Sequence, residues 1–166
     1  MKKHPWYDSE WTIQCIDNKT GKVLWEEKKH NDLVDEGERS LLMTYFRAEE
    51  VPLQFYVRLA NDAISLTDGL SNVENEPTSV HGYVPQLIER SAAGFPTVEQ
   101  VEGDWRVTSK QVSFTASGGD IGPVNVAYLA TTLDNSGKLI AVLPFNESHV
   151  IGDGTSGLVV IRIRLK

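Results

Sequence analysis

The residues able to bind metals or to transfer protons are scattered along this sequence. The four histidines, His4, His30, His81 and His149, lie at no metal-ligand spacing from one another or from the single cysteine, Cys15. The signatures of zinc proteases, serine hydrolases and phosphate-binding loops are absent. The sequence therefore predicts no catalytic residue, no metal site, no cofactor and no enzyme, although carboxylate pairs that meet only in the fold stay open.

Two loops contain residues of a kind that bind ions. Residues 152–157, Gly-Asp-Gly-Thr-Ser-Gly, resemble a phosphate loop, but they lack its lysine and lead into a predicted strand, so a plain turn is favoured. The acids of residues 61–76 offer oxygen ligands without the regular spacing of a dedicated calcium loop. We interpret them as solvated loop acids, and binding of calcium or a receptor by residues 61–80 stays open.

Length and composition indicate one globular domain. The chain has 166 residues, 40% of them hydrophobic, which is enough for a single core. Its net charge of −7 argues against nucleic acid as a partner, because affinity for phosphate backbones depends on lysine and arginine. The apolar runs are far shorter than the roughly 20 residues that cross a bilayer. We expect no membrane span, and the N-terminus does not read as a secretory signal.

The elements that would position these residues start with a hairpin. Residues 11–16 alternate between apolar and polar, residues 23–27 form a second strand candidate, and residues 17–22 between them are typical of a turn. Cys15 falls within the first strand, so we expect a small core residue rather than a nucleophile.

One helix is predicted, over residues 35–47. Asp35 and Glu38 have the spacing of a capping box, with Asp35 as the cap. Apolar residues then recur at helical spacing, and we expect the stripe to face the core. The stripe consists of Leu41, Leu42, Tyr45 and Phe46.

The rest of the chain predicts short strands separated by turns, with a long surface loop at residues 61–80. Pro85 marks the strand of residues 82–89 as an edge strand. The pattern indicates a mainly β, single-domain antiparallel β-sandwich, jelly-roll-like or Ig-like, with one short helix. Further strands are expected at residues 54–60, 105–109, 111–116, 124–132, 138–142 and 158–165. The expected core residues are Ile13, Cys15, Leu41, Leu42, Phe55, Val57, Leu59, Phe114, Ile161 and Ile163.

Four aromatic residues crowd the start of the chain. Trp11 and Trp25 can pack across the hairpin as core residues. Trp6 and Tyr7 precede the first predicted strand, in an arm of residues 1–10 ahead of the domain of residues 11–166, and are harder to bury. Since aromatic anchors carry much of an interface's energy, we predict subunit contacts at Trp6, Tyr7, Trp11 and Trp25, with core packing of the two tryptophans as the alternative.

Several segments, in order, resemble a group of tailed-bacteriophage virion proteins. Asn31-Asp32-Leu33-Val34 precedes the helix, Phe55-Tyr56-Val57-Arg58-Leu59-Ala60-Asn61-Asp62 follows it, and Thr67-Asp68-Gly69-Leu70 comes next. The series continues with Tyr83, Ile88-Glu89-Arg90, Trp105, Val112-Ser113-Phe114-Thr115-Ala116, Ile121-Gly122-Pro123-Val124, Ala127-Tyr128-Leu129-Ala130-Thr131 and Gly152-Asp153. The resemblance covers roughly residues 31–166 and is a pattern of turns and strands.

This resemblance implies a β-sandwich protein of the virion, made in the host cytoplasm. It implies a capsid decoration (cement) protein docking in many copies, or a tail or baseplate component, with major capsid or tail proteins and further copies of itself as partners. A carbohydrate-binding module and a sandwich hydrolase are the alternatives from other classes. The first would bind glycans as an isolated monomer, and the second needs carboxylates clustered around a cleft.

Overall fold

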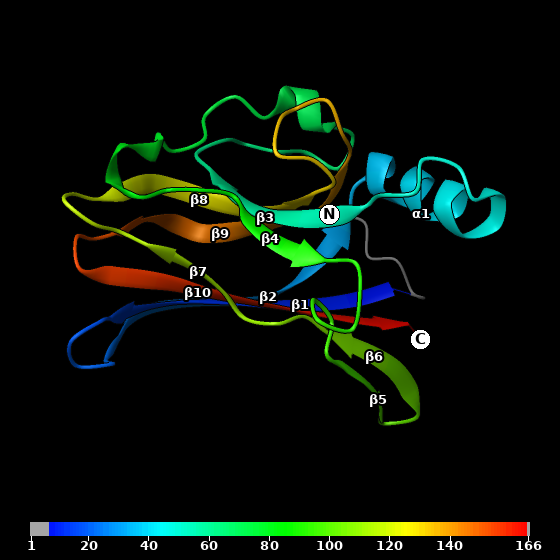
Figure 1. Ribbon diagram of the computed structural model, residues 1–166, viewed down its shortest axis with the longest axis horizontal. Helices are drawn as coiled ribbons and strands as arrows, with labels where there is room; N and C mark the ends of the chain where they lie inside the picture. Colours follow the sequence, from blue (N-terminus) through cyan, green and yellow to red (C-terminus); the bar gives the residue numbers. More distant parts are fainter. Residues whose placement is uncertain (1–6, 166) are drawn as a thin grey trace.

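The computed structural model describes residues 7–165, and within them it contains two antiparallel β-sheets and one α-helix (Figure 1). Strands make up 51% of the chain and helical residues 12%, so the predicted mainly β sandwich with one short helix is confirmed. No helix in this range is long and apolar enough to cross a membrane. The strands are β1 (Tyr7–Asp17), β2 (Val23–Leu33), β3 (Gln54–Ala60), β4 (Gln86–Glu89), β5 (Thr97–Val101), β6 (Asp104–Thr108), β7 (Val112–Thr115), β8 (Ile121–Ala130), β9 (Leu139–Ile151) and β10 (Thr155–Leu165). The helix is α1 (Asp35–Arg47), and the 3-10 turns are η1 (Leu70–Asn72) and η2 (Ser79–His81).

The strands follow one hydrogen-bonded path that folds into two layers. The order is β4-β3-β8-β9-β2-β1-β10-β6-β5, and β7 pairs with β10. Strand β2 joins the layers, because most of it pairs with β1 whereas only Asp32 and Leu33 pair with β9. The predicted hairpin of residues 11–29 is thus part of a longer hairpin, β1–β2.

The main core lies between the two layers. Inward-facing residues of β1, β3, β8, β9 and β10 fill it, in the alternation that half-buried strands show. Two of the predicted core residues, Phe55 and Ile163, are partly buried against it. The predicted core residues that are buried in it are Ile13, Cys15, Val57, Leu59, Phe114 and Ile161.

A second apolar cluster lies on the outer face of the layer that contains β3, β8 and β9. Leu70 and Val73 of the 61–80 loop are buried there with Val126 and Tyr128 of β8. Figure 1 shows the loop running above β3 and β8. Residues 61–80 contain no strand, as predicted, but the loop is a cover over the sheet and contributes to the core.

The helix has the predicted range but buries a different face. The residues of α1 that are buried are Gly37 and Ser40, which makes the prediction that Leu41 and Leu42 lie in the core wrong. A Cβ atom at Gly37 would overlap the backbone carbonyl of Ile140 in β9. Because the helix lies this close to the strand, only small residues fit between them, and the larger apolar side chains point elsewhere.

The start of α1 is held by tertiary contacts instead of the predicted capping box. The N-cap is Val34, which provides no side-chain cap. The carboxylate of Glu36 accepts hydrogen bonds from the amides of Leu70 (2.9 Å) and Leu139 (2.7 Å). Glu36 therefore joins the first turn of α1 to the 61–80 loop and to β9.

Several strand boundaries differ from the sequence analysis: β2, β9 and β10 are longer than predicted, and β4 is shorter. Residues 7–10, assigned to an arm, are the first residues of β1, where Tyr7 pairs with Leu165 of β10. Residues 1–6 lie outside the described part of the chain.

Strand β5 was not predicted, because it is an edge strand whose residues are mostly exposed and show no apolar alternation. Strand β4 is the other edge, as the proline before it indicated.

Candidate functional site

The exposed apolar side chains of α1 form a surface that we call the α1 face, made of Leu41, Leu42, Tyr45 and Phe46. Their exposed fractions are 44, 59, 82 and 76%, respectively. The rings of Tyr45 and Phe46 pack edge to face with their centroids 5.0 Å apart. Large contiguous apolar patches are rare on proteins that act alone, and they mark sites of interaction. The α1 face is therefore our candidate for a functional surface.

A groove of about 410 Å³ opens beside the α1 face, and Leu41 and Tyr45 belong to its wall. The opposite wall is the end of the other layer, where Tyr7, Leu165 and Trp105 lie side by side in strand register. Figure 1 shows α1 and the β5–β6 hairpin at the same end of the sandwich. The groove is thus the mouth between the two layers at that end.

The lining of the groove contains few polar or ionisable side chains. Its polar side chains, apart from tyrosine and tryptophan, are those of Ser40, Thr44, Arg90 and Arg106. No Asp, Glu, His or Cys is among its lining residues in the described part of the chain. The groove can accept apolar side chains, but it offers no carboxylate or imidazole for acid–base chemistry.

The four aromatic residues predicted as subunit contacts occupy different environments. Trp11 has no exposed surface and donates a hydrogen bond from Nε1 to Ser9 Oγ at 2.9 Å, so its place is in the core and it offers no surface to another chain. Tyr7 is mostly buried on the groove wall. Trp25 is half-buried and stacks on His149 with ring centroids 4.2 Å apart. Trp6 lies outside the described residues, and contacts of Trp6, Tyr7 and Trp25 with another chain stay predictions.

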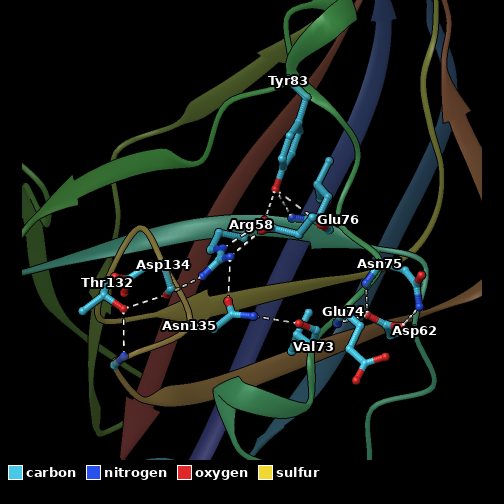
Figure 2. A network of polar contacts seen from close by, with 12 residues as sticks. Arg58, Asp62, Val73, Glu74, Asn75, Glu76, Tyr83, Thr132, Asp134 and Asn135 are labelled. Atoms are coloured by element: carbon cyan, nitrogen blue, oxygen red, sulfur yellow. Dashed lines mark hydrogen bonds and ion pairs between the residues drawn. The ribbon is translucent and has the colours of Figure 1, made fainter.

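An ion pair between buried Arg58 and partly buried Glu76 ties the 61–80 loop to the sheet (Figure 2). Arg58 of β3 is 2% exposed, and its Nε donates to Glu76 Oε1 at 2.9 Å. The guanidinium also donates to the carbonyl of Asp134 (2.9 Å) and to Oδ1 of Asn135 (3.0 Å). It lies over the ring of Tyr128 as well, at 5.3 Å from the centroid. Arg58 thus holds two loops against the outer face of one layer.

Two tyrosines complete this network. The hydroxyl of Tyr83 donates to Glu76 Oε1 at 2.6 Å and accepts from the amide of Leu59 at 3.0 Å. Burial raises the pKa of Tyr83 far above its ordinary value, and the charge of Glu76 adds to the effect. Burial and Glu76 also raise the pKa of Tyr128. Both phenols therefore stay protonated near neutral pH, so neither tyrosine serves as a base there.

Asp62 organises the other end of the same loop. Its carboxylate accepts hydrogen bonds from the amides of Glu74 (3.0 Å) and Asn75 (2.9 Å), and from the side chain of Asn75 (2.5 Å). Burial alone would raise the pKa of Asp62, but these hydrogen bonds outweigh it and lower the pKa below its ordinary value. The stabilisation by ionised Asp62 is therefore present above the pKa of the unfolded chain and is lost as the pH falls through the folded pKa.

We predict that Asp62→Asn lowers the free energy of unfolding at neutral pH and that this loss shrinks as the pH falls below about 4, the ordinary aspartate pKa of the unfolded chain, toward the lower pKa of folded Asp62. Urea unfolding of both proteins at a series of pH values measures the difference. Asp68→Asn is the control, because Asp68 accepts a single amide hydrogen bond in the same loop, from Ser65. An equal loss at pH 7 and at pH 3 would show that Asp62 contributes through packing and not through its charge.

A buried carboxylate on β2 was missed in the sequence analysis. Glu27 is 3% exposed and accepts from the amide of Asn146 (2.9 Å), while His149 Nε2 lies 3.0 Å from its Oε1. These contacts link β2 to β9 beyond the point where their backbone pairing ends. The alternation along the strand could have indicated this, since Glu27 lies on the same face of β2 as Trp25 and Leu33. Neither Glu27 nor His149 lines the groove, so the pair is interpreted as a structural link.

His4 lies outside the described residues, and within them the other candidate ligands are not brought together. His30 bonds to Asp8 and His149 to Glu27, while Cys15 is buried and bonds to Thr155. Burial raises the pKa of the Cys15 thiol, as expected for a core residue rather than a nucleophile. Within residues 7–165, no three His, Cys, Asp or Glu side chains form a group that could hold a metal ion.

Comparison with protein-family models and with curated proteins finds no relative. No protein-family model matches the chain. No curated protein matches it with significant similarity. The resemblance to tailed-bacteriophage virion proteins therefore rests on the segments quoted above.

Proposed function

We propose that the chain is a structural subunit that docks onto other protein chains in the virion of a tailed bacteriophage, with the role of a capsid decoration protein. The observation that carries the proposal is the α1 face, a group of neighbouring apolar side chains that are open to water. Such a surface is unfavourable in water unless another protein covers it. Docking in many copies would add avidity to each individual contact.

The chemistry of the groove supports docking over the alternatives from other classes. A sandwich hydrolase needs carboxylates around its cleft, and none is among the described residues that line this groove. A sugar site needs polar groups around its aromatic residues. Beside Trp105 the groove offers mainly apolar surface, which suits the side chains of a protein partner better.

The resemblance extends equally to tail and baseplate components. A chain in the tail would use the same surface, because the α1 face needs a protein partner in either part of the particle. Electron microscopy of the intact particle distinguishes head from tail, and either position keeps the proposed class of function.

We expect a phage that carries Tyr45→Gln and Phe46→Gln in this chain to contain several-fold less of it in purified particles. Glutamine is a good helix former and both positions are exposed, so α1 should still fold. Quantitative mass spectrometry gives the ratio of this chain to the major capsid protein. Leu133→Gln is the matched control, because Leu133 is exposed but belongs neither to the α1 face nor to the lining of the groove. Retention of the double variant at the wild-type ratio would contradict the proposal.

A further inference from the structure

We infer that the α1 face and the groove together form an interface between two copies of this chain, related by a two-fold axis. The inference rests on the proposed function, because it names the first partner of the surface on which that function depends. A two-fold interface uses the same patch on both copies, so the patch must be complementary to itself.

The exposed area at this end of the molecule is of the size that a stable dimer needs. Such an interface buries about 800 Å² on each partner. Aromatic side chains offer roughly 150–250 Å² each, and Tyr45, Phe46 and Trp105 are 82, 76 and 57% exposed. Leu42 of the α1 face adds apolar surface, with an exposed fraction of 59%. These side chains supply most of the area that one partner contributes.

The patch also contains both a projection and a hollow. Phe46 projects from α1, and the groove beside it is apolar and has room for an aromatic ring. A two-fold axis close to Tyr45 would place Phe46 of each copy in the groove of the other. Aromatic residues that fill such pockets usually dominate the binding energy of an interface.

In this two-fold dimer, the positive charge of Arg90 on one copy is complementary to the negative charge of Glu49 on the other. Arg90 lines the groove and bonds only to the carbonyl of Pro52, at 3.4 Å, and no carboxylate of the described residues forms an ion pair with it. Glu49 follows Phe46 by three residues, and among the described residues its carboxylate pairs with Arg47 (2.8 Å), with both side chains exposed. Exposed pairs contribute little and rearrange readily. When Phe46 enters the partner's groove, Glu49 reaches the rim where the partner's Arg90 lies.

The test measures the mass of the purified full-length chain by light scattering across the micromolar range. We expect twice the mass of one chain, and a dissociation constant raised at least about tenfold by Phe46→Gln. Leu133→Gln should leave the dissociation constant unchanged. A single-chain mass at every concentration would overturn the inference, and so would unchanged dimerisation of the Phe46→Gln protein.

Charge reversal tests the arrangement itself. Arg90→Glu and Glu49→Arg should each weaken the dimer, and the chain that carries both changes should recover most of the loss, because the pair is restored with opposite polarity. Failure of the double variant to recover would reject this contact. If Trp6→Gln abolishes the dimer and Phe46→Gln has no effect, then the N-terminal segment, and not Phe46, fills the groove of the partner. The outcomes in solution are independent of particle content, so this inference and the proposed function can fail separately.

Discussion

Replacing Glu76 with Gln is expected to lower the free energy of unfolding by about 3–5 kcal/mol, the usual effect of removing one partner from a buried ion pair. The change leaves the guanidinium of Arg58, 2% exposed, with neutral partners only. Gln has the shape of Glu, so the packing is kept, while the charge is lost and one acceptor oxygen becomes an NH2 donor that faces Arg58. Equilibrium unfolding in urea measures it, provided that the slope with denaturant stays unchanged.

Two further variants show whether the effect is specific to burial. Arg58→Met combined with Glu76→Gln removes both charges and should be less destabilising than Glu76→Gln alone. Glu99→Gln breaks an ion pair with Arg106 whose side chains are partly exposed, and should cost no more than about 1 kcal/mol. If Glu76→Gln costs as little as Glu99→Gln, then the Arg58 network does not hold the 61–80 loop.

Replacing Phe114 with Ala is expected to cost about 3–5 kcal/mol, because it leaves a cavity in the main core. Phe114 is 1% exposed and stacks on Tyr83 with ring centroids 5.7 Å apart. Phe55→Ala should cost less, because Phe55 is only partly buried, on the groove wall beside Phe95. Thermal unfolding of both variants measures the difference. If Phe55→Ala lowers the stability more than Phe114→Ala, then Phe55 is the more deeply buried side chain and the groove is filled in the isolated chain.

Strands that are buried on one face were the most predictable part of this fold. The alternation in residues 11–16 and 158–165 indicated β1 and β10, and the expected inward residues Ile13 and Ile161 are buried. Alternation follows directly from the pleat of a strand, so it survives in a single sequence. It carries no information where neither face of a strand is strongly buried, which is why β5 was missed.

The helix shows the limit of the same reasoning. Its range was predicted from helical spacing, but spacing cannot say what covers an apolar stripe. The assumption that the core covers it fails because Gly37 brings the backbone of α1 against β9. The exposed stripe became visible only in the structure, and with it the candidate site.

The buried polar network was unpredictable for a related reason. Arg58 lies on the face of β3 opposite to Phe55 and Val57, as the alternation along a strand requires. That face would be solvated in a simple sandwich, but the 61–80 loop covers it and supplies Glu76. Contacts of this kind join residues from irregular segments, which leave no periodic signal in the sequence.

The most direct test of the central claim is a cryo-electron microscopy map of the intact phage particle. We predict density for this sandwich at many equivalent positions on the particle, with the α1 face covered by protein at each of them. Particles that contain the chain with Tyr45 and Phe46 facing solvent, or that lack the chain, would contradict it.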